Sequence, residues 1–324
     1  MRPRWRRPQS LIPAALGLAA VVTLLVVLNP AQFARSVAGF RLWSVPAVVG
    51  LSTLYYLLQG LRWQPLLRAV GVRLPLGRTL LLNLSGQATG LLPLGELTRA
   101  VLVSEATGTE LGAVVATITV QELVYTLIII AAAVPGARSH PAAAEGIIAA
   151  LAGTVMVLLI LTNRALFRAV IGVVCRMPLV RRIVPQAERL QRDTVVLLRR
   201  WDTWAWSVLS VAGAMVAITL FWLVVDSLRP GFLSWQDAAF VYAVSHVVGA
   251  ITLSPGGLGG FEASVAGLLI AVGADPGTAA AAALVQRAAD KGLATPAGLV
   301  AFMIARRRYS FAGRDLFRRP AASG

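Results

Sequence analysis

The sequence is poor in the residues that build disulfides and metal sites. It has one cysteine, Cys175, and two histidines, His140 and His246, which lie far apart. A single cysteine excludes an intramolecular disulfide and a multi-cysteine metal site, and the two histidines match no metal-binding spacing. We therefore expect neither a metal ion nor a cofactor.

Charged residues are also scarce. They make up 14% of the chain, against 57% hydrophobic residues, and the mean hydropathy is +0.74. A soluble domain has about a quarter charged residues. No stretch is large enough for a separate soluble catalytic domain. The composition predicts an all-α polytopic membrane protein that forms a single membrane domain over residues 1–324.

Acidic residues are few relative to basic ones. The net charge is +16, and all basic residues except Lys291 are arginines. A chain this basic can indicate nucleic-acid binding. Here the arginines flank apolar runs, which is typical of membrane topology and of contact with lipid. We expect membrane lipids as partners, and no nucleic acid.

Long apolar runs dominate the chain. A spanning helix needs about 20 mostly apolar residues. The candidate spans are 11–28, 43–61, 112–134, 146–162, 205–225 and 278–304. The first run follows four arginines, as in a signal peptide, but it is long for one and lacks a suitable cleavage site, so we expect it to remain as a membrane helix.

The arginines predict which loops face the cytoplasm. They concentrate in the N-terminal tail, in 62–78, in 163–204 and after residue 305. By the positive-inside rule these segments are cytoplasmic. We therefore expect a protein of the inner (plasma) membrane with both termini in the cytoplasm.

Two further apolar regions, 80–106 and 237–272, are interrupted by proline and glycine near their centres. The two loops that flank each region lie on the same side of the membrane. We therefore expect both regions to be re-entrant helical hairpins, with 80–106 entering from the cytoplasmic face and 237–272 from the outer face. Irregular backbone at this depth needs protein or a water-filled cavity around it. The alternatives are that one hairpin is two tight spans or that the symmetry is accidental.

This topology predicts an inverted repeat, with repeat A at about 43–134 and repeat B at about 205–304. In transporters, interrupted segments in matching places of two repeats indicate a substrate site near the midplane.

The hairpin centres carry the first candidate site residues. Proline ends the incoming half-helix, and glycines such as Gly256 and Gly257 allow a tight reversal and close approach of the backbone. The outgoing half-helix then presents an N-terminus that favours an anion. Glu96 and Glu262 lie in its first turn, where an acid either caps the helix or carries a proton or ligand.

The last predicted span carries Arg287, Asp290 and Lys291, which share one face of a regular helix. One interpretation is a clamp for a phosphate or carboxylate, with Arg287 giving paired hydrogen bonds. The other is a buried ion network that pairs with Glu262 or Glu122 and only locks the helices.

Two further charged residues complete the predicted intramembrane set. Glu122 lies near the middle of span 112–134, and Arg99 follows Glu96 by three residues, so we expect these last two to pair. The acids and bases nearly balance, and such a network needs no metal ion. The substrate-binding set is Arg287, Lys291, Arg99, Glu96, Glu262, Glu122, Asp290, Gly256 and Gly257, with no catalytic residue.

The segment 163–204 mixes nine arginines with apolar residues, and three tryptophans, Trp201, Trp204 and Trp206, lie at its C-terminal edge or just beyond it. Such a segment can lie on the inner leaflet, where each basic residue gains about 1 kcal/mol from anionic lipid. The alternative is a solvated basic loop.

At these motifs the chain resembles the lysylphosphatidylglycerol synthase transmembrane-region family, a flippase-like group that includes the membrane half of the multiple peptide resistance factor. The first half of the resemblance rests on Leu61-Arg62-Trp63, Leu66-Leu67-Arg68, Gly71, Leu91-Leu92-Pro93, Gly95-Glu96 and Arg99. The second half rests on Ser254-Pro255-Gly256-Gly257-Leu258-Gly259, Glu262 and Gln286-Arg287. The first motif departs from the common form, which has more glycines and usually an aspartate before the arginine.

The resemblance covers roughly 10–305 and implies movement of lipid between leaflets, not aminoacyl transfer. We expect a flippase for an anionic phospholipid or a polyprenyl-phosphate-linked lipid, rather than an enzyme. The alternatives are a secondary transporter of a small organic anion or ion, and a non-catalytic membrane subunit of a lipid-modifying system. A homo-oligomer and a complex with a lipid-modifying enzyme both remain open.

Overall fold

The computed structural model describes residues 35, 37–90, 97–137, 141–174, 184–251 and 259–309, and in these ranges it is all-helical. The α-helices are α3 (Val45–Ala69), α4 (Leu76–Gly86), α5 (Leu97–Thr107), α6 (Leu111–Ala137), α7 (Pro141–Thr162), α8 (Arg164–Val174), α9 (Val184–Arg199), α10 (Trp201–Trp206), α11 (Val208–Leu228), α12 (Trp235–Ile251), α13 (Gly260–Ala271), α14 (Pro276–Arg287) and α15 (Leu293–Arg308). Short 3-10 turns at Leu42–Ser44 and Gln87–Thr89 and a π-helical segment at Ala288–Gly292 complete the fold.

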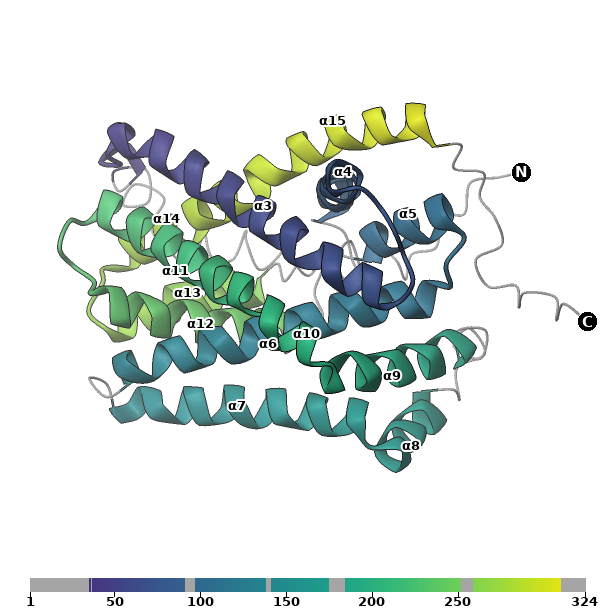
Figure 1. Cartoon of the computed structure of the whole chain (residues 1–324). Helices are drawn as coiled ribbons and strands as arrows, with labels where there is room; N and C mark the ends of the chain where they lie inside the picture. Colours follow the sequence, from purple (N-terminus) through teal and green to yellow (C-terminus); the bar gives the residue numbers. More distant parts are fainter. Residues whose placement is uncertain are drawn as a thin grey trace, which may run out of the picture.

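Four helical segments are long and apolar enough to cross a membrane: Leu42–Ala69, Leu111–Gly136, Glu145–Thr162 and Trp201–Leu228. They confirm four of the predicted spans. Helix α6 lies at the centre and packs on α12, α9, α7 and α11, while α3 packs antiparallel to α11 (Figure 1). The predicted first span, 11–28, lies outside the described residues.

The predicted last span, 278–304, differs from the structure. The chain is helical from α14 to α15, but the π-helical segment Ala288–Gly292 interrupts it, and it is not among the candidate spans. The physical reason lies in its charges: Arg287, Asp290 and Lys291 reach three different neighbouring elements, and a regular α-helix would hold them on one face.

The predicted loop 62–78 is wrong in its first half. Helix α3 continues to Ala69, so Arg62 lies inside the helix and is buried, while Arg68 is exposed. The helix keeps Trp63 and Leu67 in the core, and this burial outweighs the cost of including a charged residue.

The basic segment 163–204 is mostly helical, rather than a loop. Its helix α9 packs on the first half of α6, where Leu197 is buried beside Val120. The side-chain oxygen of Gln186 accepts a hydrogen bond from the N–H of Gly112 (2.8 Å). Helix α10 follows, with Trp201, Trp204 and Trp206 exposed.

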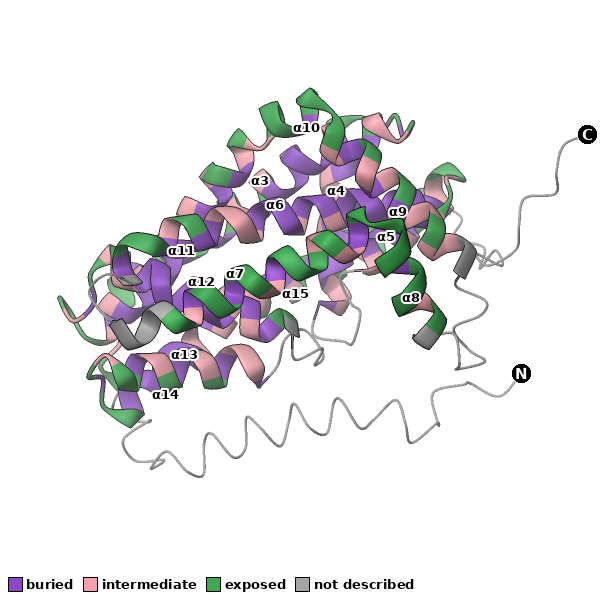
Figure 2. Ribbon diagram, turned by 90° about the horizontal axis from the view of Figure 1, so that it is seen from below, coloured by how far each residue is buried: buried purple, intermediate pink, exposed green. Residues whose placement is uncertain are grey.

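The outer surface is apolar where a soluble protein would be polar. Helix α7 is the clearest case: only 17% of its apolar stretch Glu145–Thr162 is buried in the protein, although the mean hydropathy of that stretch is 2.2. Figure 2 shows exposed positions along the length of this helix. Helix α15 likewise exposes Leu299, Val300 and Met303. Exposed apolar faces of this extent fit hydrocarbon rather than water.

The two largest apolar clusters of the described residues form two cores. The larger core joins the second half of α6 with α7, α11, α12, α13 and α14. The smaller core lies toward the other end and joins the end of α3 with α4, α5, the start of α6 and Ala305. The pair α4 and α5 and the pair α12 and α13 therefore belong to different cores and lie at opposite ends of the bundle (Figure 1).

The start of α14 offers a test of local stability. Asp275 caps this helix, since its Oδ1 accepts a hydrogen bond from the N–H of Thr278 (2.9 Å). Loss of such a cap costs about 0.5–2 kcal/mol, so Asp275→Ala should lower thermal stability in detergent, whereas Asp275→Asn should retain it.

The same cap predicts a dependence on pH. Partial burial by itself would raise the pKa of Asp275, but hydrogen bonds from Thr278 outweigh it and hold this pKa below its ordinary value. The stabilisation is therefore present above about pH 4, the value for an unfolded aspartate. It is lost as the pH falls through the lower folded-state pKa. Acid titration of the melting temperature should show this loss in the wild type and not in Asp275→Asn; equal profiles would contradict it.

Candidate functional site

Between the two apolar cores lies a layer of polar side chains from eight elements, here called the polar cluster. Helix α6 passes from one core through this polar layer into the other. Val114 and Ile118 belong to the smaller core, the polar Gln121 and Glu122 follow, and Tyr125 belongs to the larger core. The cluster consists of Tyr56, Gln59, Arg62, Asn83, Gln87, Arg99, Gln121, Glu122, Glu262, Arg287, Asp290 and Lys291.

Arg99 is the most deeply buried charge of the cluster, with a fully buried side chain. Its Nη2 lies 3.2 Å from Oε1 of Glu122, and its Nη1 donates to Oδ1 of Asn83 (3.0 Å). The guanidinium also lies 5.2 Å from the centre of the Trp63 ring, within cation–π range. Arg99 therefore ties α5 to α6, α4 and α3.

Glu262 and Arg287 form the second buried ion pair. Glu262 is 1% exposed, and its Oε1 lies 2.5 Å from Nε of Arg287. Its other oxygen accepts a hydrogen bond from the N–H of Gly259 (2.7 Å), which precedes α13. Gly259 has φ of 87°, a conformation that favours glycine. Glu262 thus caps α13 and also holds the α14 arginine.

Asp290 and Lys291 diverge from Arg287 because of the π-helical segment. Oδ1 of Asp290 accepts a hydrogen bond from the Tyr56 hydroxyl on α3 (2.5 Å), and Nζ of Lys291 lies 3.5 Å from Oε1 of Gln87. The three charges on 287–291 thus meet α13, α3 and the turn after α4. The three side chains do not share one face here, and Arg287 makes the contact with Glu262 that the ion-network interpretation predicted.

The polar cluster contains six of the nine predicted site residues: Arg99 pairs with Glu122 and Arg287 with Glu262, while Asp290 contacts Tyr56 and Lys291 contacts Gln87. Glu96, Gly256 and Gly257 lie outside the described residues, as does the expected pairing of Glu96 with Arg99. Charges that are paired in this way can hold helices together, exchange a proton, or release one partner to an incoming anion.

The sequence reasoning missed the α3 side of the cluster. Arg62 donates from Nη2 to the backbone oxygen of Gln121 (2.9 Å), and Nε2 of Gln121 donates to the backbone oxygen of Gln59 (3.1 Å). Nδ2 of Asn83 in turn donates to Oε1 of Gln59 (3.2 Å). The signal was present, since Gln59 and Arg62 are three residues apart in an apolar helix and so share a face.

Aromatic residues border the cluster on the side of the larger core. The hydroxyls of Tyr125 and Tyr242 lie 3.1 Å apart. His246 packs against both rings, with centroids 5.4 and 6.1 Å away, and Tyr55 packs edge-on against Tyr125. His246 is therefore an interior residue in an aromatic setting.

Two clefts open on the surface near this layer. The first, of about 330 Å³, lies between α3, α4 and α15 and is mostly apolar. Tyr56, which bonds Asp290, forms part of its wall. The second, of about 260 Å³, lies between the end of α3 and α10 and includes Arg68, Arg200 and Trp206.

Comparison with known proteins gives the family. The profile of the lysylphosphatidylglycerol synthase TM region matches residues 12–298, which is most of the chain. No curated protein sequence matches it. The matched region includes the four helical segments long enough to cross a membrane and the polar cluster. This multi-pass helical membrane protein belongs to the lysylphosphatidylglycerol synthase TM-region family, whose name describes the membrane part of a lipid-modifying system.

Proposed function

We propose that this protein is a lipid flippase that moves an anionic phospholipid or a polyprenyl-phosphate-linked lipid between leaflets, and that it is not itself an enzyme. One observation carries the proposal: the apolar cleft between α3, α4 and α15 ends on Tyr56, whose hydroxyl bonds Asp290 in the polar cluster. An apolar cleft for lipid tails thus lies next to polar groups suited to a headgroup.

The short interrupted elements support re-entrant hairpins. Helices α4 and α5 have 11 residues each, or about 16 Å at 1.5 Å per residue, well short of a hydrocarbon core of about 30 Å. Helix α13 has 12 residues. We propose that α4 with α5 and α12 with α13 enter from opposite faces as an inverted repeat, with the termini in the cytoplasm.

The charge pattern supports a site that opens by exchanging partners. In the described arrangement Arg287 is paired with Glu262 and Lys291 contacts Gln87. An anionic headgroup would compete for these two cations, while protonation or rehydration of Glu262 would release Arg287. Rocking of one repeat against the other then exposes the site to each leaflet in turn.

The test is reconstitution into vesicles with fluorescently labelled phosphatidylglycerol, with transfer between leaflets measured by chemical quenching. Arg287→Ala and Glu262→Gln should slow the transfer about tenfold or more, since each removes a charge-assisted contact worth about 1.5–3 kcal/mol. Arg68→Ala removes an exposed arginine and should stay close to the wild type. Equal rates for all four proteins would remove the site assignment.

A second variant tests whether lipid passes through the cleft between α3, α4 and α15. Ala297 is exposed and lines the cleft, whereas Val300 on the same helix is exposed elsewhere. Ala297→Trp should block lipid transfer, and Val300→Trp should not. Wild-type vesicles that take up a small organic anion without moving lipid would favour a secondary transporter. Vesicles in which nothing moves would favour a non-catalytic subunit.

A further inference from the structure

Arg62 differs from the other two arginines of the polar cluster, Arg99 and Arg287. It is 6% exposed and makes no ion pair within the described part of the chain. Within that part, its hydrogen bond goes to a neutral acceptor, the backbone oxygen of Gln121, and its Nε has no hydrogen-bond partner. Glu122 pairs directly with Arg99 and makes no ion pair with Arg62, although its charge also attracts the Arg62 guanidinium.

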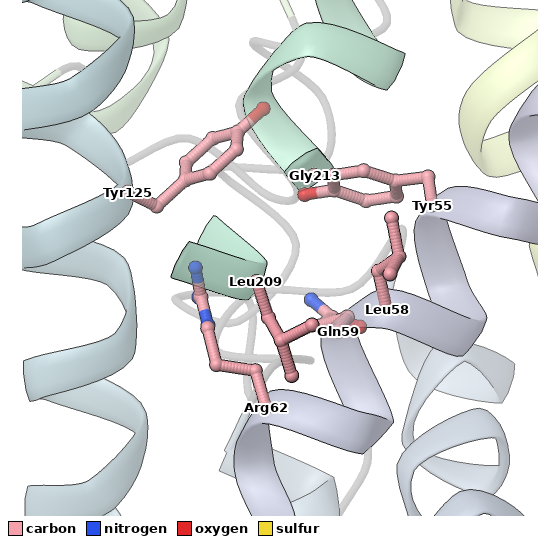
Figure 3. Close-up of a pocket in the computed structure, with 7 residues that line it drawn as sticks. All are labelled: Tyr55, Leu58, Gln59, Arg62, Tyr125, Leu209 and Gly213. Atoms are coloured by element: carbon pink, nitrogen blue, oxygen red, sulfur yellow. The ribbon is translucent and has the colours of Figure 1, made fainter. Parts of the chain in front are cut away.

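A hollow opens beside this guanidinium, here called the Arg62 hollow. It is lined by Tyr55, Leu58, Gln59, Arg62, Tyr125, Leu209 and Gly213 and has room for about one water-sized group. Figure 3 shows the Tyr55 hydroxyl and the Gln59 amide nitrogen pointing toward the space between these residues. The ring of Tyr125 lies 5.9 Å from the Arg62 guanidinium.

The electrostatics favour an anion in this space. A cation removed from water is costly unless an opposite charge and hydrogen bonds compensate it, and one backbone carbonyl supplies only part of that compensation. A guanidinium is a planar donor fork that matches the oxygens of phosphates and carboxylates. A hydroxyl and an amide on the opposite wall supply further donors to the same oxygen.

We propose that the Arg62 hollow is a seat for one anionic oxygen of a phosphate group, held by Arg62 with Tyr55 and Gln59. The size of the hollow sets the limit: it takes one oxygen, and the remainder of the ligand lies outside it, between α3 and α11. If the oxygen belongs to a lipid headgroup, the seat rests on the proposed function and adds a binding residue on α3. If it belongs to free phosphate, the seat stands independently.

Gly213 allows the hollow to be filled without touching Arg62. It lines the hollow, and a Cβ added at this position would meet no atom within 4 Å. Gly213→Leu should therefore occupy the seat while leaving the helix intact. Arg62→Gln removes the charge, and Arg68→Gln makes the same change at an exposed position of the same helix, as the matched control.

The experiment measures the melting temperature of the purified full chain in detergent against increasing inorganic phosphate, phosphatidylglycerol, or diacylglycerol, a lipid without a phosphate that should not stabilise it. We expect phosphatidylglycerol to stabilise the wild type and Arg68→Gln equally. Arg62→Gln and Gly213→Leu should each raise the half-saturating concentration about tenfold or more, the loss of about 1.4 kcal/mol of binding free energy.

The two probes identify the source of the oxygen. Stabilisation by phosphatidylglycerol alone indicates a lipid headgroup, and stabilisation by inorganic phosphate as well indicates a seat for free oxyanions. The proposal is overturned if neither probe stabilises the wild type, or if Gly213→Leu and Arg62→Gln respond as the wild type does. Lipid transfer in the vesicle assay would survive that result, so the two proposals fail separately.

Discussion

Replacing Arg99 with methionine is expected to destabilise the protein by about 3 kcal/mol or more, because breaking a buried ion pair costs about 3–5 kcal/mol. The substitution removes the donors that Glu122 and Asn83 now accept from, and it also removes the contact with Trp63. We expect a loss of stability near the lower end of this range, since the Glu122 side chain is 39% exposed and can be hydrated again.

The measurement is thermal unfolding in detergent, with the yield of monodisperse protein as a second readout. Arg78→Met is the matched control, since Arg78 is exposed near the start of α4. If the two variants melt at the same temperature, Arg99 does not hold the four helices together. A second substitution, Glu122→Gln in the Arg99→Met background, should restore part of the stability by removing the orphaned charge.

Gly298→Ala is expected to cost about 1–3 kcal/mol, the usual penalty for overpacking a close contact. An added Cβ would lie 2.5 Å from the backbone nitrogen of Ala88 and 2.7 Å from the backbone oxygen of Leu84. Neither backbone atom can turn aside as a flexible side chain would, so α15 must move away from α4. Small residues allow this kind of close helix packing in membranes.

Gly267→Ala provides the control for that variant. Gly267 lies in α13, and an added Cβ would meet nothing within 4 Å. The change should leave the stability unaltered or raise it by up to about 1 kcal/mol, the difference in helix propensity. Equal melting temperatures for the two alanine variants would show that α15 does not depend on its approach to α4. A Gly298→Ala protein that folds should also lose the contact between Lys291 and Gln87.

The helical membrane class and four spans could be predicted from sequence because they depend on composition over about 20 residues. The end of α3 could not be predicted in this way. Charge alone predicts that a loop begins at Arg62, yet Trp63 and Leu67 continue the buried face of the helix.

Only the charged residues of α5, α6, α13, α14 and the π-helical segment could be recognised from the sequence, and their contacts could not. Glu262, Arg287, Glu122 and Arg99 were recognisable because charged residues are rare within apolar segments. Which of them pair depends on how α5, α6, α13 and α14 pack, and spacing along the chain carries no such information. Residues at positions i, i+3 and i+4 share one face of a regular α-helix. Arg287, Asp290 and Lys291 do not, because a π-helical segment changes the angle between successive residues.

The pairing of charges has a consequence for the response to membrane voltage. In α13 to α15, the cluster residues Arg287 and Lys291 are balanced by Glu262 and Asp290. A shift of these helices across the field would therefore carry no net cluster charge. The potential does about 2.3 kcal/mol of work per elementary charge per 100 mV, and only a movement of α3 would place that work on Arg62 and whatever it binds. A bound anion would cancel even this, so an occupied Arg62 hollow would make the movement electrically silent.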